Sequence, residues 1–325
     1  MRGKGILAHD LQVYLVPLPH SLQAVMLMKR IFLMVPALVF AALLIVRPQE
    51  ASDAVRGGLS LCARTVIPAL FPFFVVSGLL LRLGMGGMLQ SLCSPFMMLL
   101  FRLRGVCALP LAAGLLGGYP TGAKTAAELY GQGTITKGEA ERLLGFCNNC
   151  GPGFLVGYVG QEILGDSRYG AYLFLIHTAA ALLTGMLLCR LPHKTEPLCL
   201  SCPLPAQPIA VSAAFVSAVS SALTSVLHIS AYVVLFRTAA VLIGGSIPAE
   251  ALGVLEMVSG MAVLSPGMAG FVTAAAVTAW GGLSVHCQTM SVTGKLSLRY
   301  HTAGKVIHTV LSALLAAITA NWLYR

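Results

Sequence analysis

Apolar runs separated by short polar stretches recur along the chain from Met26 to the C-terminus. Roughly 20 apolar residues are needed to cross the hydrocarbon core of a bilayer as a helix. The pattern therefore predicts an all-α polytopic membrane protein. Its predicted spans are residues 26–46, 65–81, 169–189, 229–244 and 303–322, with a shorter one at 88–101.

Other apolar segments are too short or too interrupted to cross a bilayer as one helix. The segment "GVCALPLAAGLLGG" (105–118) ends in two glycines and is followed by Tyr119-Pro120, and 251–264 and 268–283 are broken as well. A helix break inside an apolar segment frees backbone N–H and C=O groups, which are tolerated only where they are buried in protein or line a water-filled cavity. The pattern predicts broken or re-entrant helices.

The break at Gly117-Gly118-Tyr119-Pro120 has a counterpart at Gly281-Gly282-Leu283-Ser284. The same offset places the apolar run 66–84 on 230–248. Matched short, Gly/Pro-broken segments in two halves are typical of transporters built from inverted repeats. The sequence thus predicts two inverted transporter-like repeats.

The predicted boundaries follow from this repeat. The first membrane repeat covers 26–189, a Pro-rich linker loop covers 190–208, and the second repeat covers 209–325. Residues 1–25 form an N-terminal tail or a gene-calling extension, with Met26 or Met28 as the alternative start.

The two basic residues before the first apolar run, Lys29 and Arg30, predict a cytoplasmic N-terminus. Localisation in the inner cell membrane, with several passes, follows from the predicted spans.

Composition supports a membrane protein. Hydrophobic residues make up 57% of the chain and charged residues only 10%, against about 25% charged in soluble domains, and the mean hydropathy is +0.84. The net charge of +10 fits contact with anionic lipid head groups. No basic stripe interleaved with aromatics indicates nucleic acid, so the lipid bilayer is the expected partner.

The nine cysteines include two close pairs, Cys147 with Cys150 and Cys199 with Cys202. Together they imitate a four-cysteine zinc site, but the gap between the pairs is far longer than in a usual zinc ribbon. We interpret the thiols as small buried hydrophobes, and predict neither a metal site nor a cofactor.

The stretch "GGYPTGAKT" (117–125) imitates a nucleotide-binding loop. The loop requires Lys directly after the second Gly, but Ala123 stands between Gly122 and Lys124. None of the three aspartates ends an apolar strand-like run, where a magnesium ligand would be needed. The interpretation as a nucleotide-binding loop therefore fails. No set of catalytic residues in the sequence indicates an enzyme.

Residues 117–160, "GGYPTGAKTAAELYGQGTITKGEAERLLGFCNNCGPGFLVGYVG", resemble the YlbJ-type sporulation integral membrane proteins of the Gate, or nucleoside recognition, domain family. "IPALFPFFVVSGLL" (67–80) and "WGGLSVHCQ" (280–288) are similar to that family too. The resemblance implies a polytopic inner-membrane protein with transporter-like repeats and a link to spore cortex formation.

Several polar residues near the breaks are candidates for contact with a solute or ion. Lys124 and Glu128 share a helix face, and Glu256 is the only carboxylate in its apolar stretch, where proton or sodium coupling is the expected role. Asn148 and Asn149 either bind substrate or cap exposed backbone. The candidate binding residues are Gly118, Tyr119, Pro120, Thr121, Lys124, Glu128, Asn148, Asn149, Glu256, Gly282, Ser284, His286 and Gln288.

By contrast, Glu139, Glu141 and Arg142 are predicted to form a solvated helix face. For His286 and Gln288, lining of a polar cavity is favoured over metal binding.

These residues favour a secondary transporter or transporter-like channel for a small polar solute, either nucleoside-like or an ion. The alternative is a non-transporting membrane scaffold needed for spore cortex formation. The sequence leaves open the solute, the coupling ion and whether the chain forms a homo-oligomer.

Overall fold

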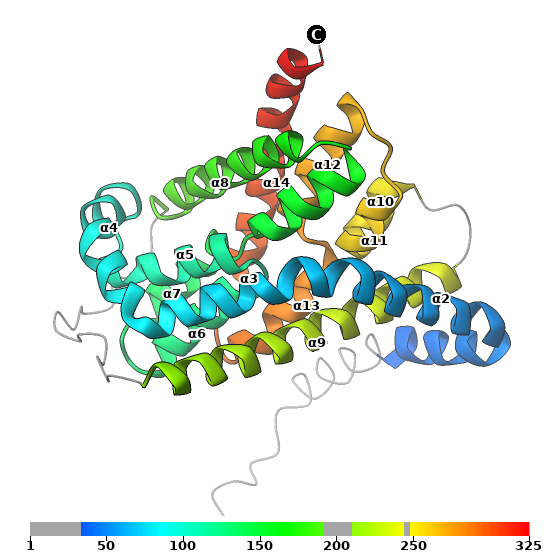
Figure 1. Ribbon diagram of the computed structural model, residues 1–325, viewed down its shortest axis with the longest axis horizontal. Coiled ribbons are helices and arrows are strands. Elements are labelled where there is room, and N and C mark those ends of the chain that lie inside the picture. Colours follow the sequence, from blue (N-terminus) through cyan, green and yellow to red (C-terminus); the bar gives the residue numbers. More distant parts are fainter. Residues whose placement is uncertain (1–33, 192–209, 244–247, 325) are drawn as a thin grey trace, which may run out of the picture. The chain divides into compact units, whose positions relative to one another are not determined.

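The computed structural model describes residues 34–191, 210–243 and 248–324, and the regular structure in these ranges is helical, with no strand (Figure 1). The chain divides into two compact units, one up to Ala51 and one from Ser52 onward. The first unit contains the apolar helix Met34–Val46. The N-terminal tail lies outside the described residues. The linker loop does too, except for Arg190 and Leu191.

The remaining helices are as follows: α2 Pro48–Leu61, η1 Cys62–Val66, α3 Ile67–Leu80, η2 Leu81–Met85, α4 Gly86–Phe101, η3 Gly105–Cys107, α5 Ala108–Gly117, α6 Thr121–Gly131, α7 Lys137–Leu144, η4 Gly153–Ile163, α8 Ser167–Leu188, α9 Val211–Ile243, α10 Ala249–Leu255, α11 Met257–Ala262, α12 Met268–Trp280, α13 Gly282–Thr293 and α14 Arg299–Leu323.

Within the described ranges, 5 helical stretches are long and apolar enough to cross a bilayer. A pair bent by 94°, formed by Gly87–Phe101 and Gly105–Gly117, would bring the number to 6. The prediction of an all-α polytopic membrane protein with a bent helix pair is confirmed. The five stretches are Pro48–Gly84, Ser167–Leu188, Val211–Ile243, Met268–Thr293 and Arg299–Leu323.

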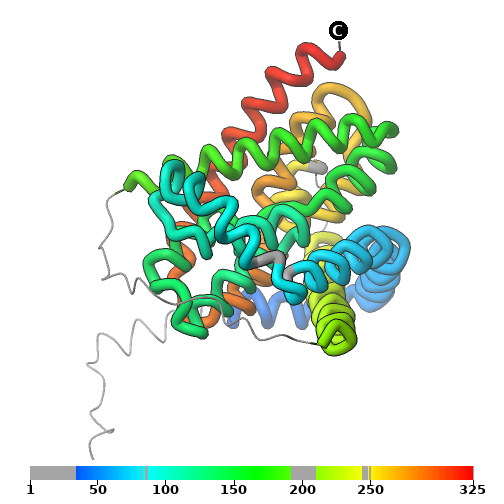
Figure 2. The backbone as a smooth tube through the Cα atoms, turned by 60° about the vertical axis from the view of Figure 1, so that its left-hand side comes forward, coloured from blue at the N-terminus to red at the C-terminus, as the bar shows by residue number. Residues whose placement is uncertain are grey.

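In the second unit, α3 and α9 run side by side, and α14 packs between α12 and α8 (Figures 1 and 2). One cluster of buried side chains joins α3, η4, α8, α9, α12 and α14, and a second one lies around α4, α5, α6 and α7. Among the short helices, α5 packs on α6, α6 packs on α13, and α13 packs on α11. The predicted breaks lie at the ends of these helices.

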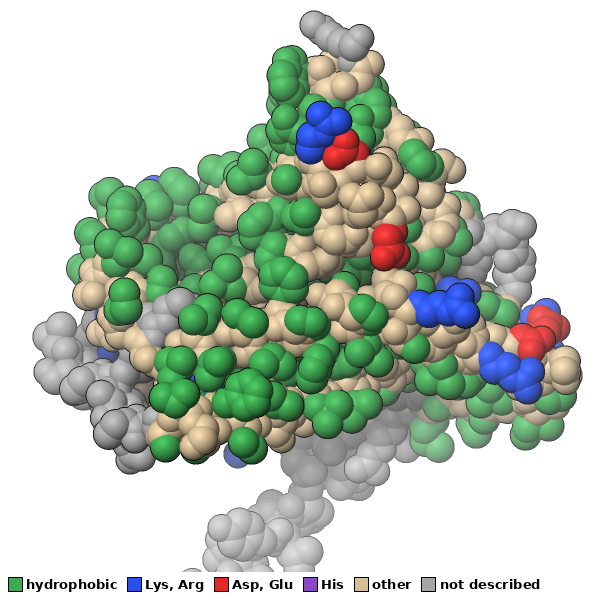
Figure 3. Space-filling model, viewed as in Figure 1, with side chains coloured by type: hydrophobic (Ala, Val, Ile, Leu, Met, Phe, Trp, Pro, Cys, Tyr) green, Lys and Arg blue, Asp and Glu red, His purple; other side chains and the backbone are tan. Residues whose placement is uncertain are grey.

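The helices present apolar side chains outward and polar ones inward, as expected for surroundings of lipid. Hydrophobic side chains cover much of the face in Figure 3, where charged groups are few. Helix α14 shows the arrangement most clearly, since Leu314 and Ile318 are exposed while His301, Lys305 and His308 are buried.

The predicted start of the span at residue 229 is wrong, because α9 begins at Val211. The preceding segment is rich in Ser and Ala, and its apolar pattern is weak. Its hydroxyls bond to carbonyls one turn earlier, as Thr224 does to Ser220 at 3.0 Å and Ser225 to Ser221 at 2.9 Å. Because these hydroxyls donate to backbone carbonyls of their own helix, the segment can continue a membrane helix without further polar partners.

The solvated helix face predicted around α7 is also wrong. Glu139 and Arg142 are buried, and Glu141 is half-buried. Two nitrogens of Arg104 donate to the Glu139 carboxylate: Nε donates to Oε1 at 2.8 Å, and Nη2 donates to Oε2. Glu139 also closes a capping box with Thr136 at the start of α7. The buried carboxylate is thus paired with an arginine 35 residues earlier, which the local pattern of α7 does not reveal.

We expect Glu139→Gln to destabilise the fold by about 3 kcal/mol, the lower end for breaking a buried ion pair. Burial alone would raise the pKa of the Glu139 carboxyl, but the hydrogen bonds from Arg104 and Thr136 lower it below its ordinary value of 4.5. A lowered folded-state pKa means that the stabilisation is present above pH 4.5 and is lost as the pH falls through the folded-state value.

Thermal unfolding in detergent, measured for Glu139→Gln between pH 7 and pH 3, checks this expectation. Glu141→Gln is the matched control. The 3.8 Å ion pair of Glu141 with Lys137 lies at a partly exposed position, and glutamine keeps an oxygen that can accept from the Ser297 nitrogen, 2.8 Å away. Equal losses of stability in the two variants would contradict the account.

Candidate functional site

The first helix break separates α5 from α6. Gly118 has a φ of 75°, in the region that favours glycine, and the Tyr119–Pro120 peptide is cis. A Cβ atom built on Gly118 would lie 3.1 Å from the backbone nitrogen of Gly151. The break is thus packed directly against the segment that follows α7.

The second break separates α12 from α13. Gly281 and Gly282 have φ values of 86° and 75°. A Cβ atom on Gly282 would lie 2.9 Å from the backbone nitrogen of Met257, the first residue of α11. Glycine at this position allows α13 to begin in contact with the junction of α10 and α11.

The two breaks contact each other although 159 residues separate the bonded pair. The hydroxyl of Tyr119 donates to the carbonyl oxygen of Thr278 at 2.9 Å. A Cβ atom on Gly281 would lie 3.5 Å from Cζ of Tyr119. The segments 117–124 and 281–288 are therefore neighbours.

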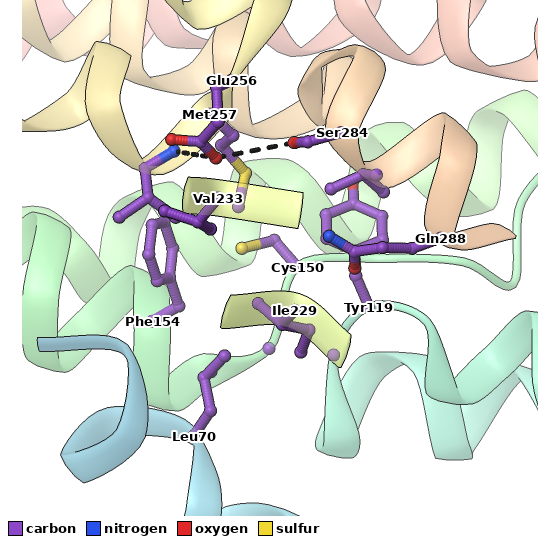
Figure 4. Close-up of a pocket in the computed structure, with 14 residues that line it drawn as sticks. Leu70, Tyr119, Cys150, Phe154, Ile229, Val233, Glu256, Met257, Ser284 and Gln288 are labelled. Carbon is purple, nitrogen blue, oxygen red and sulfur yellow. Dashed lines mark hydrogen bonds between the residues drawn. The ribbon is translucent and has the colours of Figure 1, made fainter. Parts of the chain in front are cut away.

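A small cavity lies where the breaks meet, and we call it the central cavity (Figure 4). Its volume is about 30 Å³, enough for about two water molecules. Polar groups come from Tyr119, Glu256, Ser284 and Gln288. The other lining residues are Leu70, Gly118, Cys150, Gly151, Phe154, Ile229, Val233, Met257, Val258 and Val285.

Glu256 brings a carboxylate to this cavity while being only 1% exposed. It caps α11, accepting hydrogen bonds from the backbone nitrogens of Val258 at 3.0 Å and Ser259 at 2.6 Å. Ser284 donates to the same carboxylate at 3.5 Å, as Figure 4 shows. Among the ion pairs of the described ranges none includes Glu256. The nearest link to a basic group is Arg237, which donates to the Ser259 hydroxyl at 3.4 Å.

A second and larger cavity, the side cavity, adjoins the first break between α3, α6 and α9. Its volume is about 340 Å³. Lys124 lies in it and donates to Ser221 of α9 at 3.1 Å. The residues lining it are Phe74, Ser77, Gly78, Arg82, Leu109, Pro120, Thr121, Lys124, Thr125, Glu128, Leu129, Gln132, Ser221, Ala222 and Ser225.

The predicted candidates therefore fall into two groups. Gly118, Tyr119, Glu256, Ser284 and Gln288 line the central cavity. Gly282 positions it through the contact with α11. Pro120, Thr121, Lys124 and Glu128 line the side cavity instead.

Three candidates lie beside the central cavity and not among the residues that line it. Asn148 donates to the Thr289 hydroxyl at 2.8 Å, and Asn149 caps the carbonyl of Phe146 at 2.8 Å. His286 packs on Trp280 and contacts His301, their ring nitrogens lying 3.2 Å apart. Capping of backbone, one of the two alternatives for the asparagines, describes Asn149.

The sequence analysis missed the residue that joins both breaks, Lys305. Its ammonium donates to Tyr119 Oη at 2.6 Å, to the Asn148 carbonyl at 2.8 Å and to the Ala279 carbonyl at 3.1 Å. The signal was present in the span 303–322 and just before it. Polar residues recur there every three or four positions, which marks one face of a helix; they are His301, Lys305, His308 and Ser312.

Only one of the two close cysteine pairs lies among the described residues. Cys147 and Cys150 are free and buried, whereas Cys199 and Cys202 lie outside the described residues. Burial of the first pair among apolar side chains fits the interpretation of these thiols as small hydrophobes.

No protein-family model matches the chain, and no solved structure matches it. A curated relative does: the chain is 35% identical over 159 residues to the sporulation integral membrane protein YlbJ of Bacillus subtilis (strain 168). The match covers 49% of this chain and 39% of that protein. The chain is thus similar to part of a sporulation integral membrane protein, and the match spans less than half of that protein's length.

Proposed function

We propose that the chain is a membrane transport protein of sporulating cells, in which a small polar solute or ion passes the point where the two helix breaks meet. The observation that carries the proposal is the central cavity, which both breaks and Glu256 line. Broken helices meeting in the interior of a membrane domain are the usual construction of a transporter's binding site. The role in sporulation is proposed from the relative's name.

The size of the central cavity decides which species it suits. Pockets for organic ligands usually measure about 300–1,000 Å³, ten times or more the 30 Å³ found here. A buried carboxylate beside a cavity of two water volumes suits a proton or a sodium ion. We therefore propose Glu256 as the coupling-ion site. A larger solute, such as a nucleoside, would occupy the side cavity of 340 Å³ before reaching the breaks.

The order of the helices supports the proposal of two related repeats. When the chain is shifted by the distance from Gly117 to Gly281, α3 falls on the C-terminal part of α9. With the same shift α5 falls on α12 and α6 falls on α13. Superposition of 66–124 on 230–288, with the second segment inverted across the membrane, is the expected outcome of a test of this symmetry.

Uptake into proteoliposomes tests the proposed function. The panel contains sodium, potassium, protons followed by an internal dye, ferrous iron, a nucleoside and cortex precursors. We expect saturable uptake of one of these species, dependent on sodium or on a proton gradient. Glu256→Gln should lower the ion-dependent part by about 10-fold or more, because a hydrogen bond to a charged group is worth about 1.5–3 kcal/mol.

Glu162→Gln is the matched control, since this carboxylate is exposed on η4. Sodium-dependent thermal stabilisation of the purified protein gives a second readout, because an ion that binds only the folded state raises its stability. Uptake and stabilisation that are equal in Glu256→Gln and in the unchanged protein would contradict the coupling role.

The scaffold alternative is favoured by one observation, the largely apolar lining and small volume of the central cavity. A scaffold needs the fold and not a conducting path. It predicts no uptake of any species in the panel, with Gly118 and Gly282 serving packing alone.

A further inference from the structure

Helix α14 carries a buried polar stripe through the interior of the second unit. His301, Lys305, His308 and Ser312 follow one another at spacings of four, three and four, so they share one face of the helix. All four are at most 2% exposed. The opposite face carries exposed Val306, Val310, Leu314 and Ile318. A cation and two imidazoles inside a membrane helix are a costly arrangement, which is typical of functional positions.

Lys305 is the centre of this stripe. An ammonium has three N–H donors, and its three acceptors come from three separate segments: Tyr119 at the first break, Ala279 at the end of α12, and Asn148 after α7. The ammonium also lies 4.4 Å from the centre of the Tyr119 ring. The carboxyl end of a helix favours a positive charge, and Ala279 belongs to that end of α12. One charged group therefore holds both breaks together.

Every one of these acceptors is neutral. No ion pair within the described ranges includes Lys305, so its charge is stabilised by oxygen dipoles and by the face of the Tyr119 ring. A neutral amine has only two N–H donors and carries a lone pair. After loss of a proton, either that lone pair faces a carbonyl oxygen and the contact is lost, or the Tyr119 hydroxyl turns to donate to Nζ and gives up its bond to the Thr278 carbonyl. In both cases one hydrogen bond that holds the breaks is lost.

Imidazoles surround the ammonium on both sides along α14. Toward the helix start, His301 contacts His286 of α13 with ring nitrogens 3.2 Å apart. Toward the helix end, His308 Nε2 lies 3.0 Å from the carbonyl oxygen of His177 in α8. That carbonyl can only accept, so Nε2 of neutral His308 carries the hydrogen and Nδ1 is left as a proton acceptor.

The titratable groups near Lys305 come from each neighbouring segment. His177, His286, His301 and His308 interact electrostatically with it, as do two thiols after α7. Among the described residues these groups are Tyr119 at the first break, Cys147 and Cys150, His177 of α8, His286 of α13, and His301 and His308 of α14 itself.

We propose that Lys305 is a proton-operated latch. Its ammonium ties the two helix breaks and the segment after α7 together, and transfer of one proton to a neutral imidazole of the stripe releases them. In the transfer an Nζ–H bond breaks, its electron pair stays on Nζ, and a new N–H bond forms at Nδ1 of His308, which becomes an imidazolium. The imidazolium then gives one proton to water and returns to the neutral form. Release therefore removes one proton from the protein and is favoured as the pH rises. His308 is one turn away on the same face, within reach of a lysine side chain after a rotamer change or through one water. For transport the latch rests on the proposed function, but release of the breaks is measurable without any solute.

Cys150 is a natural reporter of release. It lines the central cavity, is 2% exposed and directly precedes Gly151, which packs on the first break. In a variant that keeps Cys150 as its single cysteine, a water-soluble maleimide is reacted with the protein in proteoliposomes between pH 6 and pH 9. The rate is divided by the rate for the same thiol in SDS at the same pH. The pH dependence that remains in Lys305→Arg, which carries the same buried thiol, measures the part that comes from thiolate formation and is subtracted.

We expect the normalised rate to rise about 10-fold from pH 6 to pH 9, the effect of losing one hydrogen bond to a charged group. Lys305→Met should react rapidly at every pH. Lys305→Arg, which stays charged at every pH, should react slowly throughout. His308→Gln removes the proton acceptor and should flatten the pH dependence while keeping the slow rate.

Lys295→Met is the matched control, because this lysine is exposed between α13 and α14. A pH-independent rate in the unchanged protein would overturn the latch, and this series needs no Lys305 variant to fold. A slow rate in folded Lys305→Met would overturn it as well. Uptake by the proposed transport activity is scored separately, so either claim can fail while the other stands.

Discussion

Gly282→Ala is expected to abolish uptake in proteoliposomes, although it adds only one methyl group. The φ of 75° at this position is one that residues with a Cβ atom rarely adopt, at a cost of roughly 1–2 kcal/mol. The added carbon would also lie 2.9 Å from the nitrogen of Met257 and 3.2 Å from the carbonyl of Leu255. Both atoms are backbone and flank Glu256, so the proposed ion site is displaced together with the second break.

Gly118→Ala should have the same effect from the other side of the cavity. Its Cβ atom would lie 3.1 Å from the nitrogen of Gly151 at a φ of 75°. Larger side chains at either position, such as leucine, should abolish uptake completely while the spans still insert.

Gly157→Ala is the control for these substitutions. Gly157 is exposed within η4, and a Cβ atom there would meet nothing within 4 Å. Uptake should be unchanged, with stability equal or higher by roughly 0.5–1 kcal/mol. The assay compares uptake at equal amounts of inserted protein, and wild-type uptake by Gly282→Ala would contradict the role of the second break.

The helix breaks could be predicted from the sequence because their cause is local. Two adjacent glycines, or glycine followed by proline, interrupt a helix whatever surrounds it. The repeat of this pattern at Gly117 and Gly281 indicated that the two breaks belong together. The place of Glu256 among the residues of the candidate site was indicated in the same local way, by one carboxylate in an apolar stretch.

Other parts of the site depend on partners that are distant in the sequence. The hydroxyl and carbonyl that hold Lys305 at Tyr119 and Asn148 lie 186 and 157 positions away. No local pattern contains that information. The position of Lys305 in a polar stripe of α14 can be read from the sequence. The periodicity does not tell which segments the stripe contacts.

Burial of α7 was missed for the same reason. A helix rich in Glu and Arg resembles a solvated surface, and only the approach of Arg104 shows that Glu139 is inside. The prediction that His286 lines the polar cavity is a smaller error. It lies on the helix that lines the cavity, yet its ring packs on Trp280, away from Ser284 and Gln288.

The central claim is that two breaks from opposite halves of the sequence form one site. Cysteines at Tyr119 and Val285, in a background without other cysteines, test it most directly, because both positions line the central cavity. We expect most of the protein in native membranes to form an intramolecular cross-link with a short bifunctional thiol reagent. Replacing the second position by Leu314→Cys, on the exposed face of α14, should remove the cross-link. Failure of the Tyr119–Val285 pair to cross-link, with both thiols sealed from water-soluble reagents, would contradict a shared site at the helix breaks.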